Sequence, residues 1–265
     1  METLPRPTQS GRPEAAREQP RAASLLDARP GGIAERLARS ARLRSLHPAA
    51  VFFVVMLAGL VVIALVSTLC GLAVRELEHV SAIGAPDERV DVWLAAHRTA
   101  DRTRASLVGS TIGGGVVLPI VAGSIALVCC CLRKWRIAAF VVFVLAVESA
   151  TYRITTLLVH SHRPRVVRLE HLPVNASYPS GHTAASLAVY GGLALLLTYR
   201  FTSRTVQVLA WTLALGLVSF VAVSRMYRGM HHPLDVAGGL VVGVLAIVVV
   251  TFACRTAGAV AEARR

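Results

Sequence analysis

The chain has 265 residues, of which 54% are hydrophobic and only 16% are charged. Soluble domains carry about 25% charged residues, so this composition argues against a soluble globular protein and favours a membrane protein. The formal net charge is +13, but the basic residues gather in the N-terminal region and in short loops between apolar runs, a distribution that argues against a nucleic-acid partner.

The first 48 residues are rich in Arg, Pro and Ala and show no sustained apolar period. We expect 1–30 to be disordered and 33–46 to form a basic amphipathic helix on the membrane surface. The chain is therefore predicted to have three regions, which are a basic cytoplasmic N-terminal region (1–48), a membrane domain (49–254) and a short cytoplasmic tail (255–265).

Six apolar runs follow the N-terminal region. A helix that crosses a bilayer takes about 20 residues, with a range of about 17 to 25, and all six runs qualify. The predicted fold class is therefore all-α, an integral membrane bundle of six transmembrane helices. The runs cover 49–74, 107–132, 137–159, 183–199, 206–223 and 234–254.

The distribution of Arg and Lys orients this bundle. With a cytoplasmic N-terminus, 17 of these residues lie inside and 10 outside, so the positive-inside rule favours cytoplasmic termini in a plasma membrane. In the first outer loop, Val90, Trp93, Leu94 and His97 have helical spacing. They predict a short interfacial helix within 87–104, with Trp93 at the lipid boundary.

Three polar clusters lie at the predicted outer ends of spans. They are 160–165 (HSHRPR), 179–182 (PSGH) and 224–235 (SRMYRGMHHPLD). Because alternate loops emerge on the same side of a membrane, we expect the three clusters to form one outward-facing site.

Arginines and a helix start make this site suitable for phosphate. A guanidinium group binds phosphate oxygens in a planar, bidentate way. Ser180 and Gly181 begin the fourth span, and the free N–H groups at a helix start favour anions. The candidate phosphate-binding arginines in the clusters are Arg163, Arg165, Arg225 and Arg228.

Two histidines and one carboxylate supply acid–base chemistry. His182 and His231 can exchange protons near neutral pH. Asp235 lies four residues after His231, where it can fix the imidazole tautomer as the acid of a Ser-His-Asp triad does. His232 is three residues from the same carboxylate and competes for it. We expect His232 and the histidines of 160–165 to be bystanders.

Carboxylates are too few for a metal-dependent phosphatase. Between residues 105 and 260 the only acids are Glu148, Glu170 and Asp235. A two-metal site needs several ligands around ions about 3.5–4 Å apart, and the sequence has no HExxH spacing. We expect chemistry without a metal or another cofactor.

The motifs Arg163-Pro164, Pro179-Ser-Gly-His182 and Ser224-Arg225-x5-His231-x3-Asp235 resemble, in order and spacing, the three motifs of the type 2 phosphatidic acid phosphatase family. The resemblance extends over roughly the last four spans. It implies that His231 attacks phosphorus and becomes a transient phosphohistidine, that Asp235 orients His231, and that His182 protonates the leaving oxygen and then activates water. The residues that it implies for the phosphoryl oxygens are Arg163, Arg225, Ser180 and Gly181.

One position departs from the family. Its first motif begins with a Lys seven residues before the Arg, and this chain has Thr156 there. Arg153 lies one helical turn earlier, and we predict that it replaces the missing cation as a phosphate-binding residue. The alternative is that Arg153 pairs with Glu148 inside the bundle, because an ionisable residue at that depth is functional or paired.

These observations predict a phosphatase for lipid phosphates or diphosphates at the outer membrane face. The expected partners are membrane lipids and a lipid substrate such as polyprenyl diphosphate, phosphatidic acid or phosphatidylglycerol phosphate. Two alternatives remain open, a lipid phosphotransferase that passes the phosphate to an acceptor alcohol, and a non-catalytic protein that binds or transports lipid phosphate. No oligomeric state is predicted.

Overall fold

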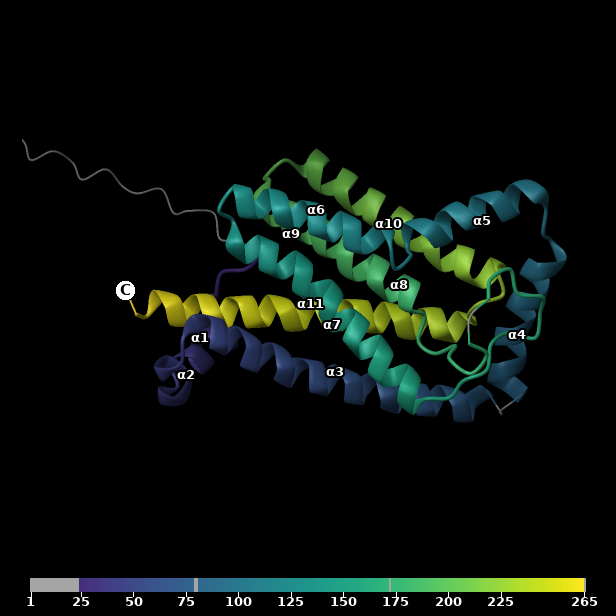
Figure 1. Ribbon diagram of the computed structural model, residues 1–265, viewed down its shortest axis with the longest axis horizontal. Coiled ribbons are helices and arrows are strands. Elements are labelled where there is room, and N and C mark those ends of the chain that lie inside the picture. Colours follow the sequence, from purple (N-terminus) through teal and green to yellow (C-terminus); the bar gives the residue numbers. More distant parts are fainter. Residues whose placement is uncertain (1–23, 79–80, 172, 265) are drawn as a thin grey trace, which may run out of the picture.

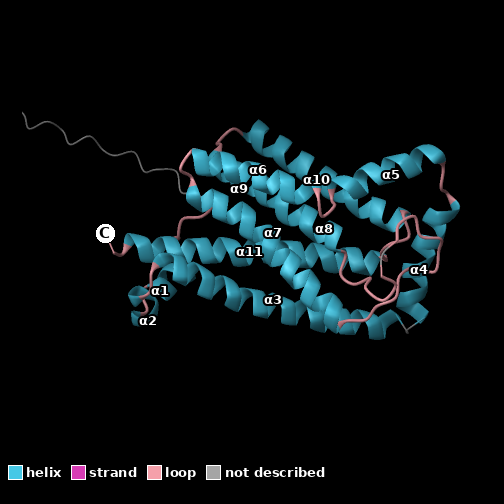
Figure 2. Ribbon diagram, in the orientation of Figure 1, coloured by secondary structure: helices cyan, strands magenta, loops and turns pink. Residues whose placement is uncertain are grey.

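The structure is a computed structural model that describes residues 24–78, 81–171 and 173–264. Over these ranges the chain forms helices joined by loops, without a regular strand (Figure 2). The predicted all-α class is therefore confirmed. The helices are α1 (Ile33–Ala38), α2 (Ala41–Ser45), α3 (Pro48–Glu78), α4 (Ser81–Ala96), α5 (Ala100–Ile112), α6 (Val117–Cys131), α7 (Trp135–Leu158), α8 (Gly181–Ser186), η1 (Leu187–Gly191), α9 (Gly192–Arg200), α10 (Arg204–Tyr227) and α11 (Pro233–Glu262).

The helices provide five membrane spans, or six when a bent pair is taken as one span. α3, α7, α10 and α11 are single spans, and α8, the π-helical turn η1 and α9 together form another. α5 and α6 form the bent pair, with a 42° change of direction at the break between them. Three glycines, Gly113–Gly115, occupy this break, where their low helix propensity favours an interruption.

The spans lie side by side along the long axis of the molecule (Figure 1). α1, α2 and the C-terminus lie at one end, while α4, the loop 159–180 and the turn 228–232 lie at the other, which we call the motif end. α11 is central and packs against α3, α7 and α8. The core between the spans is apolar and includes Phe140, Val144 and Val250.

Large apolar side chains also cover the outside of the bundle. Val61 of α3, Leu127 of α6 and Leu213 of α10 are each about two-thirds exposed. Such surfaces suit the hydrocarbon interior of a bilayer, where helices satisfy all of their own backbone hydrogen bonds. The chain is a multi-pass membrane protein.

The N-terminal region differs from the expectation of disorder up to residue 30. Leu25 and Leu26 are buried in the core cluster at the end opposite the motif end. Arg136 forms an ion pair with Asp27 at 2.7 Å and donates to the Leu26 carbonyl, and Arg255 donates to the Leu25 carbonyl. Burial of Leu25 and Leu26 and the hydrogen bonds to their carbonyl groups hold residues 24–30 in place. The rest of the segment that was expected to be disordered, 1–23, lies outside the described residues.

The expected single surface helix over 33–46 is divided into two short helices. α1 ends at Ala38, and α2 begins after Ser40, whose extended backbone interrupts the helix. Ala34 and Ala38 are buried against α11, while Ile33 and Leu37 are exposed.

Candidate active site

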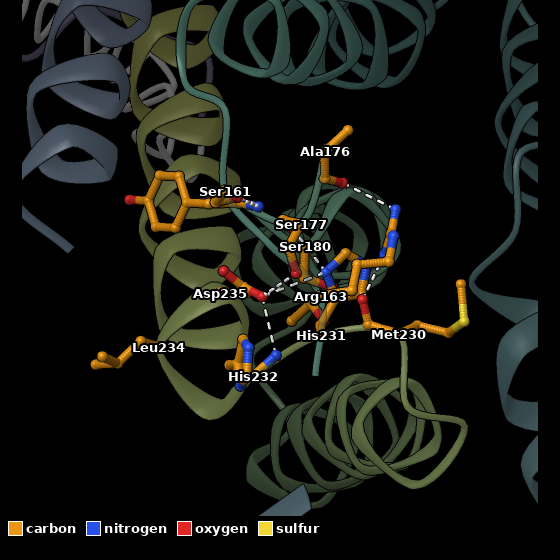
Figure 3. A network of polar contacts seen from close by, with 12 residues as sticks. Ser161, Arg163, Ala176, Ser177, Ser180, Met230, His231, His232, Leu234 and Asp235 are labelled. Carbon is orange, nitrogen blue, oxygen red and sulfur yellow. Dashed lines mark hydrogen bonds and ion pairs between the residues drawn. The ribbon is translucent and has the colours of Figure 1, made fainter. Parts of the chain in front are cut away.

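The three polar clusters meet at the motif end, although they are far apart in the sequence (Figure 3). The loop 159–180 folds back on itself, since Ser161 forms an isolated bridge with Ala176 and its hydroxyl accepts the Tyr178 N–H at 2.6 Å. The Tyr178 ring then packs between Gly71 of α3 and Gly238 of α11, where any side chain would collide with it. This packing fixes the loop against the start of α11. Asp235 lies in the first turn of α11, and His231 lies just before the helix begins.

The geometry of His231 determines which of its nitrogens carries hydrogen. The side chain is buried, and Nδ1 lies 2.8 Å from the Ser177 carbonyl oxygen. Because a carbonyl only accepts, Nδ1 carries the hydrogen and Nε2 retains the lone pair that a nucleophile requires. Burial lowers the pKa of His231 to about 4, and the nearby Asp235 carboxylate raises it by less. His231 is therefore neutral at neutral pH.

Asp235 is close to His231 but binds other groups directly. Its Oδ2 accepts the Ser177 hydroxyl at 2.5 Å and the His232 N–H at 2.9 Å, and it lies 3.8 Å from His231 Nδ1. Asp235 thus holds Ser177, and Ser177 in turn orients His231 through its carbonyl group. The sequence analysis did not identify Ser177, because a role that a backbone carbonyl performs leaves no side-chain signal.

Arg163 organises the loop around His231. Its guanidinium group donates to three backbone carbonyls, those of Pro173 and Ala176 at 2.8 Å each and that of Met230. The side chain is largely buried and lines the same cavity as His231. Arg163 therefore joins the loop after α7 to Met230, the residue that precedes His231.

Arg225 and Arg228 share one carboxylate, that of Glu170. Arg225 Nη1 donates to Glu170 at 2.7 Å and to the Ser110 hydroxyl at 2.5 Å, and Arg228 Nε donates to Glu170 at 2.5 Å. Burial raises the pKa of Glu170, but Arg225, Ser110 and Arg228 outweigh it and lower the pKa to about 2. The sequence analysis named Glu170 only as a rare acid. Among the described residues, Arg225 Nε and Nη2 are buried without a partner, so these donors are available to an anion.

The start of α8 contributes Ser180, Gly181 and His182. The Ser180 N–H donates to the Asp235 carbonyl at 2.9 Å, and its hydroxyl lies 3.0 Å from that of Thr183. The Ser180 hydroxyl is thus shared with its own helix. Gly181 lies against the Tyr152 ring, 3.0 Å from where a Cβ would be. His182 follows and lines the cavity with His231.

α4 adds an acidic contribution that the sequence analysis missed. The predicted interfacial helix is present, and Trp93 is exposed on it, but the helix spans Ser81–Ala96. Two of its acids face the segment that follows His231. Asp91 Oδ2 lies 2.9 Å from His232 Nδ1, and Asp87 accepts the Leu234 N–H. Burial lowers the pKa of His232, but Asp91, Asp235 and Asp87 outweigh it and raise the pKa to about 9. His232, expected to be a bystander, is a charged anchor for α4.

A cavity of about 420 Å³ joins these groups to the interior of the bundle. Its outer part contains the histidines and Arg163, and its inner part, next to the α5–α6 break, contains Leu118 and Leu145 together with Glu148. The lining residues include His182, His231, Arg163, Tyr152, Arg153, Thr156, Glu148, Leu118 and Leu145.

Arg153 and Glu148 both line this cavity, but no ion pair joins them within the part of the chain that the structure describes. Glu148 is fully buried and accepts the Ser149 hydroxyl at 3.1 Å. The Thr156 hydroxyl donates to the Arg153 carbonyl. The alternative in which Arg153 pairs with Glu148 therefore finds no support in this geometry. The described residues also contain no group of three or more His, Cys, Asp or Glu that could hold a metal ion.

Comparison with known proteins agrees with this arrangement. Residues 137–257 match the sequence model of the PAP2 superfamily. This stretch of the chain belongs to the PAP2 superfamily. All residues of the three motifs, from Arg163 to Asp235, lie within it.

Two curated relatives and one solved structure are similar to parts of this chain. The undecaprenyl-diphosphatase of Sulfolobus acidocaldarius is 34% identical over 116 residues, which are 42% of this chain and 51% of the relative. The undecaprenyl-diphosphatase BcrC of Bacillus subtilis is 35% identical over 95 residues, 34% of this chain and 44% of the relative. The chain thus spans about half, or less, of the length of these relatives.

The solved structure is a PAP2 type phosphatidylglycerolphosphate phosphatase from Bacillus subtilis. It is 22% identical to this chain, with a TM-score of 0.61 over 72% of this chain and 93% of the other. This likeness confirms the membrane PAP2 fold.

Proposed function

We propose that this protein is a lipid phosphate or diphosphate phosphatase that acts at the outer face of the membrane through a phosphohistidine. The observation that carries the proposal is the neutral His231, whose Nε2 lone pair is free while Nδ1 is bound to the Ser177 carbonyl. A histidine nucleophile needs this tautomer. Its neighbours in the cavity, His182 and Arg163, suit a reaction at a phosphate.

The reaction takes two steps at this site. His231 Nε2 attacks phosphorus, the bond from phosphorus to the leaving oxygen breaks, and His182 gives that oxygen a proton. His182 then takes a proton from water, which attacks the phosphohistidine and releases inorganic phosphate and free His231. After the second step, both histidines have returned to the states in which they began.

Charge stabilisation comes from the surrounding donors. Arg225 has two unpartnered nitrogens, and the start of α8 supplies the N–H groups of Gly181 and His182. Such preorganised donors stabilise the charge that develops on phosphoryl oxygens. When His231 becomes an imidazolium, the Asp235 carboxylate 3.8 Å away stabilises its charge.

The cavity favours a lipid substrate, because its inner part lies between spans and includes the apolar side chains of Leu118 and Leu145. The relatives carry names that refer to undecaprenyl diphosphate and phosphatidylglycerol phosphate, so polyprenyl diphosphates and phosphatidic acid type lipids are the substrates to test. The excess of Arg and Lys at the opposite end of the bundle supports an outward-facing site.

The test is phosphate release by the purified protein in detergent with EDTA present. Farnesyl diphosphate and dioleoyl phosphatidic acid serve as substrates, and His231→Gln is compared with His160→Gln, which alters an exposed histidine outside the cavity. We expect release from wild type and His160→Gln and a loss of more than about 1,000-fold in His231→Gln. Full activity of His231→Gln, or release only with added metal, would contradict the proposal.

Three further measurements address the mechanism and the orientation. A reaction quenched with alkali, in which the phosphorus–nitrogen bond of a phosphohistidine is stable, is expected to retain labelled phosphate on wild type and none on His231→Gln. Adding an acceptor alcohol distinguishes hydrolysis from phosphotransfer, because a transferase gives a phosphorylated alcohol in place of free phosphate. In right-side-out vesicles, an outward site releases phosphate to the external medium, and release into the lumen would reverse the orientation.

A further inference from the structure

Arg153 is an arginine inside a membrane span that has no acidic partner among the described residues. Its side chain is exposed and lines the cavity. Glu148 lies on the same wall but forms no ion pair with Arg153 in the described part of the chain, since its Oε2 accepts the Ser149 hydroxyl and its Oε1 is buried without a partner. A charged side chain at membrane depth is costly unless it meets an anion or water. An anionic substrate in the cavity would supply such a partner for Arg153.

The position of Arg153 differs from that of the Lys in the family motif. α7 runs toward the motif end and finishes at Leu158, so Arg153 lies three residues deeper than Thr156. At a rise of about 1.5 Å per residue, the difference is about 4.5 Å along the helix axis. A cation there lies deeper in the cavity than the position at which the family places its Lys.

The cavity also determines which way a lipid lies. The transferred phosphate must reach His231 at the motif end, and the tail must lie along the apolar wall that includes Leu118 and Leu145. Whatever joins the transferred phosphate to the tail therefore passes the level of Arg153. In a lipid diphosphate, that connecting group is the second phosphate, the one that remains on the lipid.

From this arrangement we infer that Arg153 is a specificity-determining residue that binds the retained phosphate of a lipid diphosphate, so that the site prefers diphosphates over monophosphates. The inference rests on the proposed function. His231 attacks the terminal phosphorus, the bond from that phosphorus to the bridging oxygen breaks, and the lipid monophosphate leaves with the electron pair and a proton from His182. Arg153 stabilises the charge that develops on this leaving phosphate.

The experiment compares two substrates that share one tail, farnesyl diphosphate and farnesyl monophosphate. The variants are Arg153→Ala, Arg153→Lys, which restores the charge, and Lys134→Ala, which removes an exposed charge at the opposite end of α7. The measurement is kcat/KM of each purified full-length protein for both substrates, with thermal unfolding to confirm that each variant is folded.

We expect Arg153→Ala to lower kcat/KM for the diphosphate on the order of 100-fold, as for the loss of one charge-stabilising donor. The monophosphate value is expected to change less than about fivefold, Arg153→Lys to recover part of the diphosphate activity, and Lys134→Ala to match wild type. Equal losses on both substrates, a larger loss on the monophosphate, or no loss on either would overturn the inference. If wild type releases phosphate from neither lipid, the proposed function itself fails, which is a separate result.

Discussion

The His232–Asp91 pair, which joins α4 to the segment that contains His231, predicts an unequal response to the loss of either partner. Both side chains are buried, and Nδ1 and Oδ2 are 2.9 Å apart. The perturbations are His232→Gln and Asp91→Asn, each of which removes one charge and retains a similar shape.

The pKa values give the size of the effect. The pKa of His232 is about 9, against an ordinary 6.5, and this difference corresponds to about 3 kcal/mol in favour of the folded state. Because the folded pKa is the higher one, the contribution is complete below pH 6.5 and is lost as pH rises through 9. Burial raises the pKa of Asp91 to about 6 from 3.8, while His232 lowers it, so the buried carboxylate costs about 3 kcal/mol above pH 6. The intact pair is therefore close to neutral.

Removing one partner affects the two charges differently at pH 7. In Asp91→Asn, His232 can lose its proton at little cost, since its ordinary pKa is below 7, and we expect a loss of about 1 kcal/mol for the hydrogen bond. In His232→Gln, Asp91 is left as a buried carboxylate without its cation, and we expect a loss of about 3 kcal/mol.

The assay is reversible unfolding in mixed detergent micelles, followed by tryptophan fluorescence, at several pH values between 6 and 10. Wild type is expected to lose up to about 3 kcal/mol between pH 6.5 and 9. Asp91→Asn is expected to lose most of this pH dependence, with Asp87 and Glu88 on α4 and Asp235 on α11 supplying the remainder. A larger loss in Asp91→Asn than in His232→Gln, or an unchanged pH dependence in Asp91→Asn, would refute the reasoning.

Three further predictions concern other contacts. Gly238→Ala places a Cβ 2.3 Å from the Tyr178 ring and is expected to cost about 1–3 kcal/mol, whereas Gly216→Ala, which meets open space, leaves the midpoint of thermal unfolding unchanged or higher. Glu170→Gln removes a carboxylate whose pKa is about 2. The free energy of unfolding is therefore expected to fall by about 3 kcal/mol above pH 4.5, and this difference from wild type disappears as pH falls toward 2. An equal difference at pH 3 and pH 7 would contradict the prediction. Arg136→Ala releases the 24–30 segment and is expected to lower the midpoint of thermal unfolding while kcat stays within about twofold of wild type, which a paired stability and activity measurement checks.

The spans were predictable from the sequence because long apolar runs have one stable arrangement in a bilayer. The three motifs were also predictable as neighbours, since alternate loops share a side of the membrane. The sequence did not reveal the order in 24–30, because two leucines in an Arg-rich segment carry little signal until Arg136 and Arg255 supply partners for the backbone.

For the site, the sequence predicted which motif residues lie near one another, but it did not predict the hydrogen bonds between them. Spacing along a helix suggested that Asp235 meets His231, whereas Ser177 is placed between them by a loop whose path depends on Arg163. The acids of α4 were not predicted to approach His232, because their helical spacing describes a surface helix equally well. Contacts made through backbone carbonyls and between distant segments leave no local pattern.

The break between α5 and α6 separates two helices with different neighbours. Before the break, Ser110 donates to Glu170 and accepts from Arg225, and α5 packs along α10. After it, α6 packs along α7, and Leu118 belongs to a small core with Ala185 and Val189. If the protein is the lipid phosphatase proposed above, substitutions on this bent pair will separate into two phenotypes, with changes before Gly113 altering phosphate affinity through the arginines and changes after Gly115 altering which lipid tails are accepted.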